Sequence, residues 1–547
     1  MKALSQHKAR GAFFTPPRMA EFIVEWAIRD KSDAVLEPSC GEAAFLLPTV
    51  HKLVSKGASQ KAISRQLSGA ELHEPSAQEA CRLVAEATRV DLSDSIGIGD
   101  FFTMRAGQDL PFVDACVGNP PYIRYQDFSG DARKNGREAA LLQGVRLDGL
   151  ASSWAPFTVH AASFVKEGGR LGLVLPAELL SVNYAAPVRR FLLERFGCVR
   201  VILFEERVFP GVLEEVVLLL AEGSGPCDKF DLVQVSDLEH LPDLVDRDWG
   251  ALPHHGKWTD LLLPSDVAPA VSAVEATDTF VELTDLASVS IGMVTGANSF
   301  FCVSDAERKA RRIPKRDLLP MMPPGSKHIR GFEYSADDRA TASNSGERVW
   351  LFYPSAEPSR EAMRKIREGA HEGLDNAYKC RVRSPWHRVP LVRPPDFFLT
   401  YMTASGPRLV RNDAGLINVN SVHSVYLKKQ ARVDCGLFAV ACMSSMTMLS
   451  AELVGRAYGG GLLKLEPREA ARLAVPSARL ISRARRRLEA ALPEIDIMTA
   501  DKDYAGITTL VDEIILRQTL GLGAEVVDAL RRGRDQLHGR RVRRSQS

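Results

Sequence analysis

Closely spaced cysteine pairs are missing from this 547-residue sequence, although it contains nine cysteines. No two of them form a Cys-x-x-Cys motif, which argues against a zinc ribbon and against a thioredoxin-like redox site. The adjacent His254 and His255 have no further ligand at a suitable spacing, so no metal site is expected. Thiols in a chain of this size are expected to be reduced and mostly buried, as in the cytoplasm.

Long hydrophobic runs are also missing. No apolar stretch approaches the roughly 20 residues that span a bilayer, and the polar N-terminus lacks the apolar core of a signal peptide. We therefore expect a cytoplasmic protein without a membrane partner. The composition, with 45% hydrophobic and 25% charged residues, is that of a folded globular protein. Its net charge of +2 does not by itself indicate a nucleic-acid partner, so any basic surface must be local.

The first 225 residues show a regular alternation of short apolar runs and helical patterns. This alternation predicts an α/β domain with a doubly wound, mostly parallel sheet, whose ligands bind at the carboxyl ends of the strands. The runs at 201–204 and 216–220 are spaced to form an antiparallel edge. The other predicted strands lie at 34–36, 67–72, 113–117 and 170–175.

Composition divides the chain into three regions. Residues 1–225 form the α/β domain, and a Gly-, Ser- and Pro-rich segment at 223–228 marks its end. Residues 226–475 have Pro-rich loops, scattered aromatics and Arg/Lys clusters without sustained alternation, which favours a mixed α+β domain. Residues 476–547 are helical and strongly basic, with Ser477 as a helix cap.

Acidic residues follow two of the predicted strands. Glu37 and Ser39 begin a loop of small residues, where a ligand can approach the backbone and a carboxylate can balance a positive charge. Glu71 ends the next strand, where an acidic residue can bind a ribose diol. The alternative for Glu71 is a solvated surface residue. No Gly-x-Gly-x-x-Gly motif is present, which weakens a dinucleotide interpretation.

Two further motifs each have a purely structural alternative. Asp100 is suited to accept a hydrogen bond from an adenine amino group, with Phe101 lying along the ring. The alternative is a helix N-cap followed by core aromatics. Thr15 and Pro16 precede an amphipathic helix, and the alternative is that they only start that helix, with Thr15 as its cap.

The sharpest signal is Asn119-Pro120-Pro121-Tyr122, at the end of a predicted strand. Consecutive prolines fix φ and remove two backbone donors, so the strand cannot continue. The Asn119 side chain and the Pro120 carbonyl are then free to accept hydrogen bonds from one amino group. A purely structural loop rarely needs an asparagine, two prolines and an aromatic in this order.

Taken in sequence, these motifs resemble those of the gamma-class DNA adenine-N6 methyltransferases of restriction–modification systems, including the Taq-type and Eco57I-type enzymes. The resemblance covers residues 1–225 well and extends more weakly to 291–298 and 458–461. It implies a class I methyltransferase fold that uses S-adenosylmethionine (AdoMet), followed by a target-recognition domain. It implies that AdoMet is bound by Thr15, Pro16, Glu37, Ser39, Glu71, Asp100 and Phe101. It implies that a flipped-out adenine is held by Asn119, Pro120, Tyr122 and Phe209.

The same tetrapeptide also occurs in protein-glutamine methyltransferases and in some RNA methyltransferases, so these substrates stay open. A DNA-specificity subunit without activity is a further alternative, although the intact tetrapeptide argues against it. The long C-terminal region favours double-stranded DNA as the partner. No carboxylate cluster typical of a two-metal nuclease stands out, so a cognate restriction endonuclease is expected to be a separate chain.

Several clusters of basic residues in the C-terminal half are candidates for DNA contacts. The alternative for each cluster is a solvated basic face or a disordered tail. The candidates are Arg381, Arg383, Trp386, His387, Arg388, Arg483, Arg485, Arg486, Arg487, Arg540, Arg541, Arg543 and Arg544.

Overall fold

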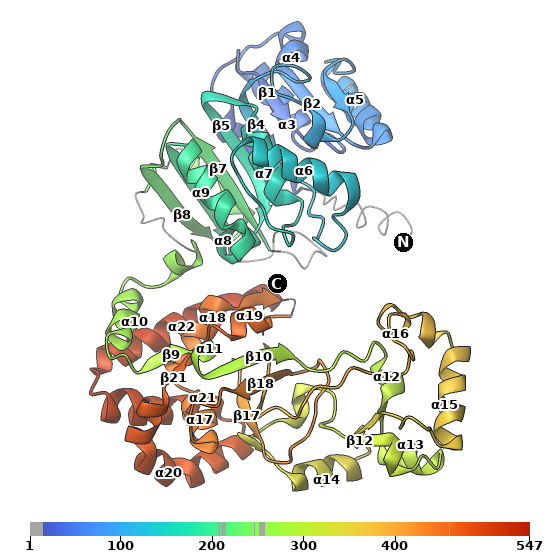
Figure 1. Cartoon of the computed structure of the whole chain (residues 1–547). Helices are drawn as coiled ribbons and strands as arrows, with labels where there is room; N and C mark the ends of the chain where they lie inside the picture. The colour runs from blue at the N-terminus through green and yellow to red at the C-terminus, as the bar shows by residue number, and fades with distance from the viewer. Residues whose placement is uncertain are drawn as a thin grey trace. The chain divides into compact units, whose positions relative to one another are not determined.

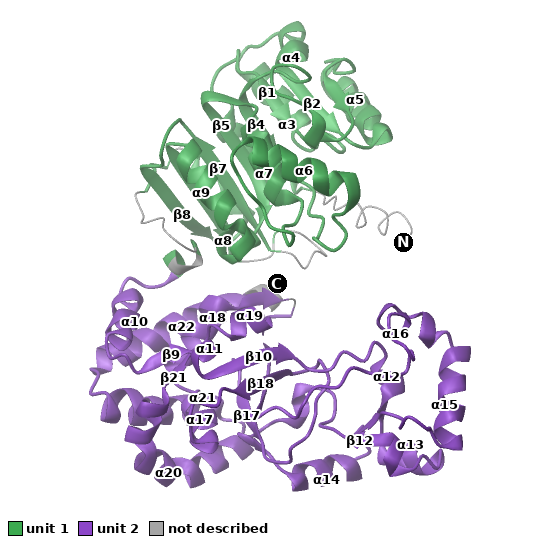
Figure 2. Cartoon of the chain, in the orientation of Figure 1, with its two compact units in different colours: residues 1–262, 547 green, residues 263–546 purple. Residues whose placement is uncertain are grey.

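The computed structural model describes residues 15–205, 208, 215–245, 247–250, 258–458 and 460–546. The chain divides into two compact units, residues 1–262 and 263–546, which are described separately (Figure 2). The division comes later than the boundary predicted at residue 225, because strand β8 (Lys229–Val235) continues the sheet of the first unit. The basic tail is not a separate region either, since its helices share a hydrophobic core with the rest of the second unit.

The first unit is built on an eight-stranded sheet with the order β3-β2-β1-β4-β5-β7-β6-β8. Neighbours pair in parallel except β7, which is antiparallel to both β5 and β6. The doubly wound α/β sheet and the antiparallel β6–β7 pair are therefore confirmed, although β8 rather than β6 forms the edge. The remaining strands are β1 (Val35–Glu37), β2 (Leu67–Glu71), β3 (Ile96–Ile98), β4 (Val113–Gly118), β5 (Val165–Pro176), β6 (Cys198–Phe204) and β7 (Val216–Glu222).

Helices cover both faces of this sheet (Figure 1). α2 packs on β4, β5 and α3, and α3 packs on α5, so these three helices form one layer. α7 packs on β5 and on two helices, α6 and α9. These three helices, α6, α7 and α9, form the other layer. The helices are α2 (Pro17–Ala27), α3 (Leu46–Ser55), α4 (Gln60–Gln66), α5 (Glu74–Thr88), α6 (Gly130–Leu142), α7 (Trp154–Ala162), α8 (Glu178–Ser181) and α9 (Ala186–Arg195).

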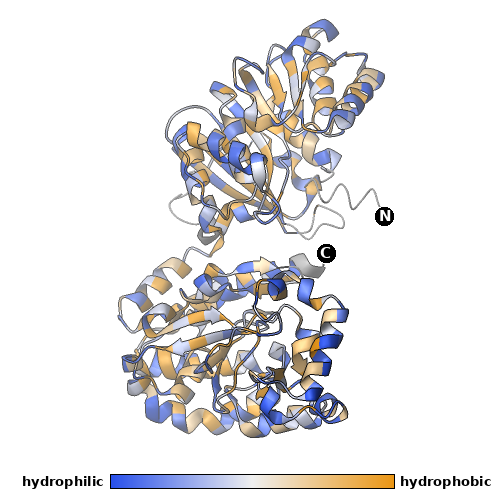
Figure 3. Cartoon of the chain, turned by 45° about the vertical axis from the view of Figure 1, so that its right-hand side comes forward, coloured by the Kyte–Doolittle hydropathy of each residue, from blue (hydrophilic) through white to orange (hydrophobic). Residues whose placement is uncertain are grey.

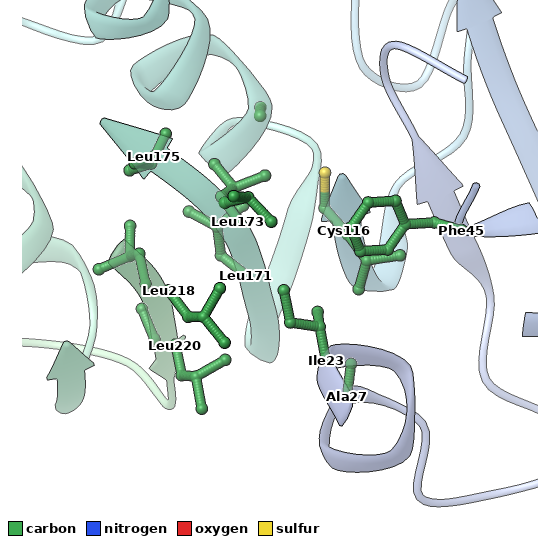
Figure 4. Packing of buried hydrophobic residues seen from close by; sticks show 14 of the residues in the cluster. Ile23, Ala27, Phe45, Cys116, Leu171, Leu173, Leu175, Leu218 and Leu220 are labelled. Carbon is green, nitrogen blue, oxygen red and sulfur yellow. The ribbon is translucent and has the colours of Figure 1, made fainter. Parts of the chain in front are cut away.

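Strand β5 shows how closely one layer approaches the sheet. Leu171 and Leu173 are buried on one face of the strand, and Gly172 between them faces the other. A Cβ added to Gly172 would lie 2.6 Å from Ile23 Cγ2 on α2. The missing side chain therefore allows α2 to lie directly against β5, as the packing around Ile23 in Figure 4 illustrates.

The second unit combines small sheets with helices, as predicted for a mixed α+β domain. Its largest sheet has the order β10-β18-β15-β17-β13. Figure 3 shows hydrophobic residues along the strands and hydrophilic residues on the outer sides of many helices, in both units. The strands of this sheet are β10 (Ala287–Ile291), β13 (Glu333–Tyr334), β15 (Phe397–Leu399), β17 (Leu409–Asn412) and β18 (His423–Leu427). The smaller sheets contain β9 (Phe280–Glu282), β11 (Cys302–Val303), β12 (Leu318–Pro320), β14 (Trp350–Phe352), β16 (Met402–Thr403), β19 (Arg456–Tyr458), β20 (Leu462–Lys464) and β21 (Ala474–Pro476).

The C-terminal region is helical, as predicted. Ser477 caps its first helix by accepting a hydrogen bond from the backbone N–H of Leu480 at 3.3 Å. Within the described residues, no single helix is long and apolar enough to cross a membrane; α17 and α18 meet that test only as a pair bent by 71°. The helices are α10 (Val267–Glu275), α11 (Leu283–Leu286), α12 (Asn298–Phe301), α13 (Asp305–Ala310), α14 (Ala336–Asn344), α15 (Arg360–His371), α16 (Tyr378–Arg381), α17 (Cys435–Ala441), α18 (Ser445–Val454), α19 (Pro467–Ala470), α20 (Ala478–Ala500), α21 (Tyr504–Asp512) and α22 (Ala524–Gln546).

Gly172→Ala is expected to destabilise the first unit, because its methyl group would press α2 away from β5. Overpacking of this kind costs about 1–3 kcal/mol of unfolding free energy, measurable by urea denaturation. Gly149→Ala is the matched control, since nothing lies within 4 Å of a Cβ added there. Equal stabilities of the two variants would contradict this account of the packing.

Candidate functional site

The carboxyl ends of β1, β2 and β4 lie at one edge of the sheet, because these strands are parallel neighbours. Glu37 is the last residue of β1 and Glu71 is the last residue of β2. Asn119 follows Gly118, where β4 ends. Three of the side chains singled out in the sequence thus belong to one edge of the sheet.

The loop after β1 is shaped for the close approach of a ligand. Gly41 has a φ of +46°, and nothing lies within 4 Å of a Cβ added to it. Ala43 also has a left-handed φ, of +66°, although it carries a side chain; such a conformation costs a non-glycine residue about 1–2 kcal/mol. The Cys40 N–H donates to Ala70 O at 3.0 Å and fastens the loop to β2, while Ser39 is half-buried in it.

Glu37 is buried, with 2% of its surface exposed. Backbone N–H groups of Phe45 and Leu46, at the start of α3, favour the ionised form of its carboxyl group. Its Oε2 atom nevertheless has no partner among the described residues. Burial raises the pKa of Glu37 well above the ordinary carboxyl value, the two N–H groups oppose this shift, and the charge of Glu71 adds to it. A cationic ligand would favour the ionised form again.

Glu71 organises the loop from the neighbouring strand. Its Oε2 accepts a hydrogen bond from the N–H of Gly41, and its Oε1 accepts one from the N–H of His73, both at 2.9 Å. Two large apolar side chains stand exposed beside it: Leu72 (73% exposed) follows Glu71, and Ile98 (54% exposed) is its register partner on β3. Neither residue could be singled out from the sequence, because an isolated leucine or isoleucine at the end of a strand gives no signal until its exposure is known.

Asp100 and Phe101 are placed as the structural alternative predicted, that is, as a helix N-cap followed by a core aromatic. Asp100 caps the short helix Phe101–Thr103 by accepting a hydrogen bond from Phe102 N, and its Oδ2 accepts another from Asn135 Nδ2 at 3.0 Å. The ring of Phe101 is 5% exposed and stacks on Phe164 with centroids 5.1 Å apart. Phe101 is thus mainly a core aromatic, and its role beside an adenine stays a prediction.

Thr15 does not cap α2, so that alternative is wrong. The N-cap of α2 is Pro16, and no side chain satisfies the end of the helix. Thr15 is instead 5% exposed, and its Oγ1 accepts a hydrogen bond from Asn119 Nδ2 at 3.0 Å. Residues 104 positions apart in the sequence are joined by this bond.

Asn119 is the most informative residue of the site. While its Nδ2 donates to Thr15, its Oδ1 is buried without a partner in the described part of the chain. Buried amide oxygens are nearly always hydrogen-bonded, because leaving one unpaired costs about 1–3 kcal/mol. An acceptor kept empty at the carboxyl edge of the sheet indicates that a ligand supplies the donor.

The chain after Asn119 is held in place by hydrogen bonds to β5 and to the start of α7. Tyr122 is buried, and its hydroxyl donates to Val174 O on β5 at 2.9 Å. Ser153, at the start of α7, donates to Pro121 O and accepts a hydrogen bond from Ile123 N at 2.8 Å. Ser153 gave no signal in the sequence, because its role depends on contacts across 30 residues. Phe209 lies outside the described residues.

The predicted DNA-contacting residues divide into structural and exposed ones. Arg383 donates to Val294 O and Thr295 O at 2.6 and 2.7 Å, so it braces a loop within the second unit. Arg541 is 5% exposed and pairs with Glu452 at 2.7 Å. Arg540 is also buried, so the alternative of a solvated basic face or disordered tail is wrong for these two residues, and a DNA contact by either stays a prediction. The exposed candidates include Arg381, Arg483, Arg485, Arg486, Arg487 and Arg543.

The rest of that aromatic and basic segment is also tied into the second unit. Trp386 packs on Phe300 with ring centroids 5.5 Å apart, and Arg388 donates to Pro354 O at 2.7 Å. His387 is half-buried. Over the described ranges, no group of three or more His, Cys, Asp or Glu side chains is arranged to hold a metal ion.

Comparison with protein families identifies both parts of the chain. Residues 1–240 match the family described as N-6 DNA Methylase, and residues 255–516 match the C-terminal domain of Type II methyltransferase M.Eco57I. The chain belongs to the gamma-class DNA adenine-N6 methyltransferases of restriction–modification systems. The resemblance seen in the sequence is therefore confirmed, and the RNA, protein-glutamine and inactive-subunit alternatives give way to an adenine-specific DNA methyltransferase.

Curated relatives match most of this methyltransferase. Type II methyltransferase M.AccI of Acinetobacter calcoaceticus is 23% identical over 483 residues, and M.XamI of Xanthomonas campestris pv. amaranthicola is 25% identical over 484. Each match covers 85% of both chains. The solved Type IIL restriction-modification enzyme MmeI, in complex with DNA, has a TM-score of 0.57 at 12% identity, covering 92% of this chain and 73% of that one. This likeness concerns the fold, and it agrees with a class I methyltransferase sheet followed by a C-terminal domain.

The raised pKa of Glu37 makes the stability of the cofactor-free methyltransferase depend on pH. Folding favours protonated Glu37, so its contribution is fully present below the ordinary carboxyl pKa of 4.5 and is lost as pH rises through the raised value. Glu37→Gln removes this loss. Thermal unfolding between pH 5 and pH 8 should therefore show a smaller fall in stability for the variant than for the wild type.

Glu42→Gln is the matched control for this measurement, because Glu42 is an exposed carboxylate on the same loop. It should leave the pH profile of the wild type unchanged. A Glu37→Gln profile that coincides with the wild-type profile would contradict the assigned burial of this carboxyl group.

Proposed function

We propose that this chain methylates N6 of an adenine flipped out of double-stranded DNA, at the carboxyl edge of β1, β2 and β4. The family establishes adenine-specific DNA methylation; the proposal concerns the site and the way it acts. The observation that carries it is the empty acceptor Asn119 Oδ1, which is buried and already oriented by a hydrogen bond from its own Nδ2. An amino group is the ligand chemistry that such an acceptor requires.

The residues at the ends of β1 and β2 fit AdoMet. The unpaired oxygen of Glu37 suits a positively charged ligand, and the open space at Gly41 admits a ligand close to the backbone. Glu71 suits the ribose hydroxyls, and the exposed Leu72 and Ile98 offer apolar surface to an adenine ring. When bound, AdoMet supplies an electrophilic methyl group. Thr15, Pro16, Ser39, Asp100 and Phe101 complete the proposed cofactor site.

The chain's contribution to the chemistry is to activate a weak nucleophile. The lone pair of the adenine amino nitrogen is delocalised into the ring, so the nitrogen attacks poorly. Asn119 Oδ1 and the Pro120 carbonyl each accept one N–H, which pulls the nitrogen toward a tetrahedral geometry and localises its lone pair. Fixed acceptors of this kind act through positioning and electrostatics, without a covalent enzyme intermediate.

Base flipping follows from the position of the target atom. The N6 atom of a paired adenine is inaccessible inside the duplex, so the base must leave the stack. We assign Tyr122 to one face of the flipped base and Phe209 to the neighbourhood of the other. Each stacking contact replaces about 1–3 kcal/mol of lost base stacking. The hydroxyl bond from Tyr122 to β5 keeps its ring from moving with the base.

Sequence recognition is assigned to the second unit. Because several of its arginines are used within the unit, direct contacts with DNA fall to exposed cations such as Arg381, Arg486 and Arg487. We further propose that the chain works in the cytoplasm as a modification enzyme, with any cognate restriction endonuclease on a separate chain.

The test of the proposed function is the identity of the methylated product. DNA, RNA and protein substrates are incubated with the enzyme and AdoMet, digested, and examined by mass spectrometry. We expect N6-methyladenine in duplex DNA and no methyl group on the other substrates. Transfer only to RNA or to protein glutamine would overturn the proposal.

Asn119→Ala is expected to lower turnover by at least about 10²-fold, the cost of removing one group that stabilises a transition state. AdoMet affinity, measured by calorimetry, should stay nearly unchanged, because the side chain is assigned to the base. Asn344→Ala, at an exposed position on α14, is the matched control and should keep full turnover. Near wild-type turnover in Asn119→Ala would rule out the assignment.

A further inference from the structure

The hydrogen bond that Asn119 Nδ2 donates to Thr15 leaves Oδ1 as the unpaired end of the Asn119 amide among the described residues. We propose that Thr15 is a positioning residue, whose hydroxyl selects the reactive orientation of Asn119 and links that orientation to the occupied cofactor site. The inference rests on the proposed function, and it adds a role that the cofactor assignment of Thr15 does not contain.

The two ends of an asparagine side chain have opposite hydrogen-bonding character. Oδ1 accepts hydrogen bonds, whereas Nδ2 donates them. An adenine amino group is activated only by acceptors, so a half-turn of the Asn119 amide would place a donor against a donor. The two orientations have nearly the same shape, so packing alone does not distinguish them. A polar neighbour is therefore needed to stabilise one orientation over the other.

Thr15 is that neighbour in this structure. Its Oγ1 accepts a hydrogen bond from Asn119 Nδ2 at 3.0 Å, which leaves Oδ1 buried and unpaired among the described residues. Thr15 is 5% exposed, so bulk water competes poorly for this bond. It stands directly before α2, which packs on β4 and β5. The helix therefore holds the hydroxyl in place beside the end of β4.

A hydroxyl group can also donate, so Thr15 by itself does not exclude the reversed amide. The choice depends on where the hydroxyl proton goes. In the described residues, Thr15 Oγ1 makes no second hydrogen bond, so this proton remains available. The hydroxyl could donate a hydrogen bond to an anionic acceptor in the cofactor site, and the carboxylate of AdoMet is such an acceptor at the methionine end that Thr15 is assigned to line. The lone pair of Oγ1 then stays directed at Nδ2.

This arrangement makes cofactor binding and base binding cooperative. If Thr15 donated a hydrogen bond to the carboxylate of a bound cofactor, the reactive amide orientation would be favoured and the base would be held more tightly. By linkage, the base must tighten cofactor binding by the same factor. One net hydrogen bond corresponds to about a 3- to 10-fold change in affinity.

The experiment measures this cooperativity without turnover. Its probes are sinefungin, a non-reactive AdoMet analogue with the same carboxylate, and two duplexes carrying the site that the wild type methylates. One duplex has adenine at the target position, and the other has purine, which lacks the 6-amino group. Sinefungin should tighten wild-type binding to the adenine duplex about 3- to 10-fold more than binding to the purine duplex.

Thr15→Val keeps the shape of the side chain but removes the hydroxyl. It should abolish this adenine-specific enhancement and lower kcat about 10- to 100-fold through misplaced orientation. Thr15→Ser retains the hydroxyl and should preserve the enhancement. Thr88→Val is the matched control. It removes a part-buried hydroxyl group that donates a hydrogen bond to Val84 O at the end of α5, away from the site.

The outcomes separate this inference from the proposed function. Thr15→Val with undiminished enhancement and kcat would overturn the inference, as would loss of the enhancement in Thr15→Ser, which would point to the methyl group instead. A wild type that methylates adenine but binds both duplexes equally in the presence of sinefungin would also overturn it. A wild type that methylates no adenine in DNA would instead overturn the proposed function.

Discussion

The candidate site of the first unit depends on a pair of buried oxygen atoms that have no hydrogen-bond partner among the described residues. Glu37 Oε2 and Asn119 Oδ1 both belong to the carboxyl edge of the sheet, and each unpaired atom costs about 1–3 kcal/mol. A fold retains such a cost at a functional site when the rest of the structure compensates for it. Here the compensation comes from the parallel core strands and from α2 and α3, which fix both side chains before any ligand arrives.

The same edge shows how a few backbone contacts prepare a site for a large ligand. Glu71 accepts two backbone N–H groups and so fixes the loop that contains Gly41 and the left-handed Ala43. Ser153 fixes the chain after Asn119 from the opposite side. Preorganised groups of this kind do not have to rearrange during the reaction, which is where enzymes gain much of their electrostatic stabilisation.

The sequence predicted the features that depend on local patterns. The alternation of strands and helices gave the doubly wound sheet, and the prolines after Asn119 correctly ended β4. Glu37, Glu71 and Asn119 were correctly expected at one edge of the sheet, because strand ends in such sheets gather there. β3 was missed, since Gly97 interrupts its short apolar run Ile96-Gly97-Ile98, and β8 was missed because polar residues interrupt it.

What the sequence did not predict depends on contacts between distant residues. Thr15 is a residue type that commonly caps helices, yet it bonds to Asn119, which follows β4, and α2 packs on β4 and β5. Arg541 lies in a run of arginines that is typical of a basic tail, yet it is buried against Glu452. A charged residue in a sequence shows neither its burial nor its partner, so charge clusters alone did not predict which arginines are exposed.

The most direct test of this account is the distance between the target nitrogen and Asn119 Oδ1. A crystal structure of the enzyme with sinefungin and a duplex containing its methylation site would measure it. The account predicts a flipped adenine with N6 about 2.7–3.2 Å from Asn119 Oδ1, within hydrogen-bond distance. A flipped adenine whose amino group faces Asn119 Nδ2, or lies beyond hydrogen-bond reach of Oδ1, would contradict it.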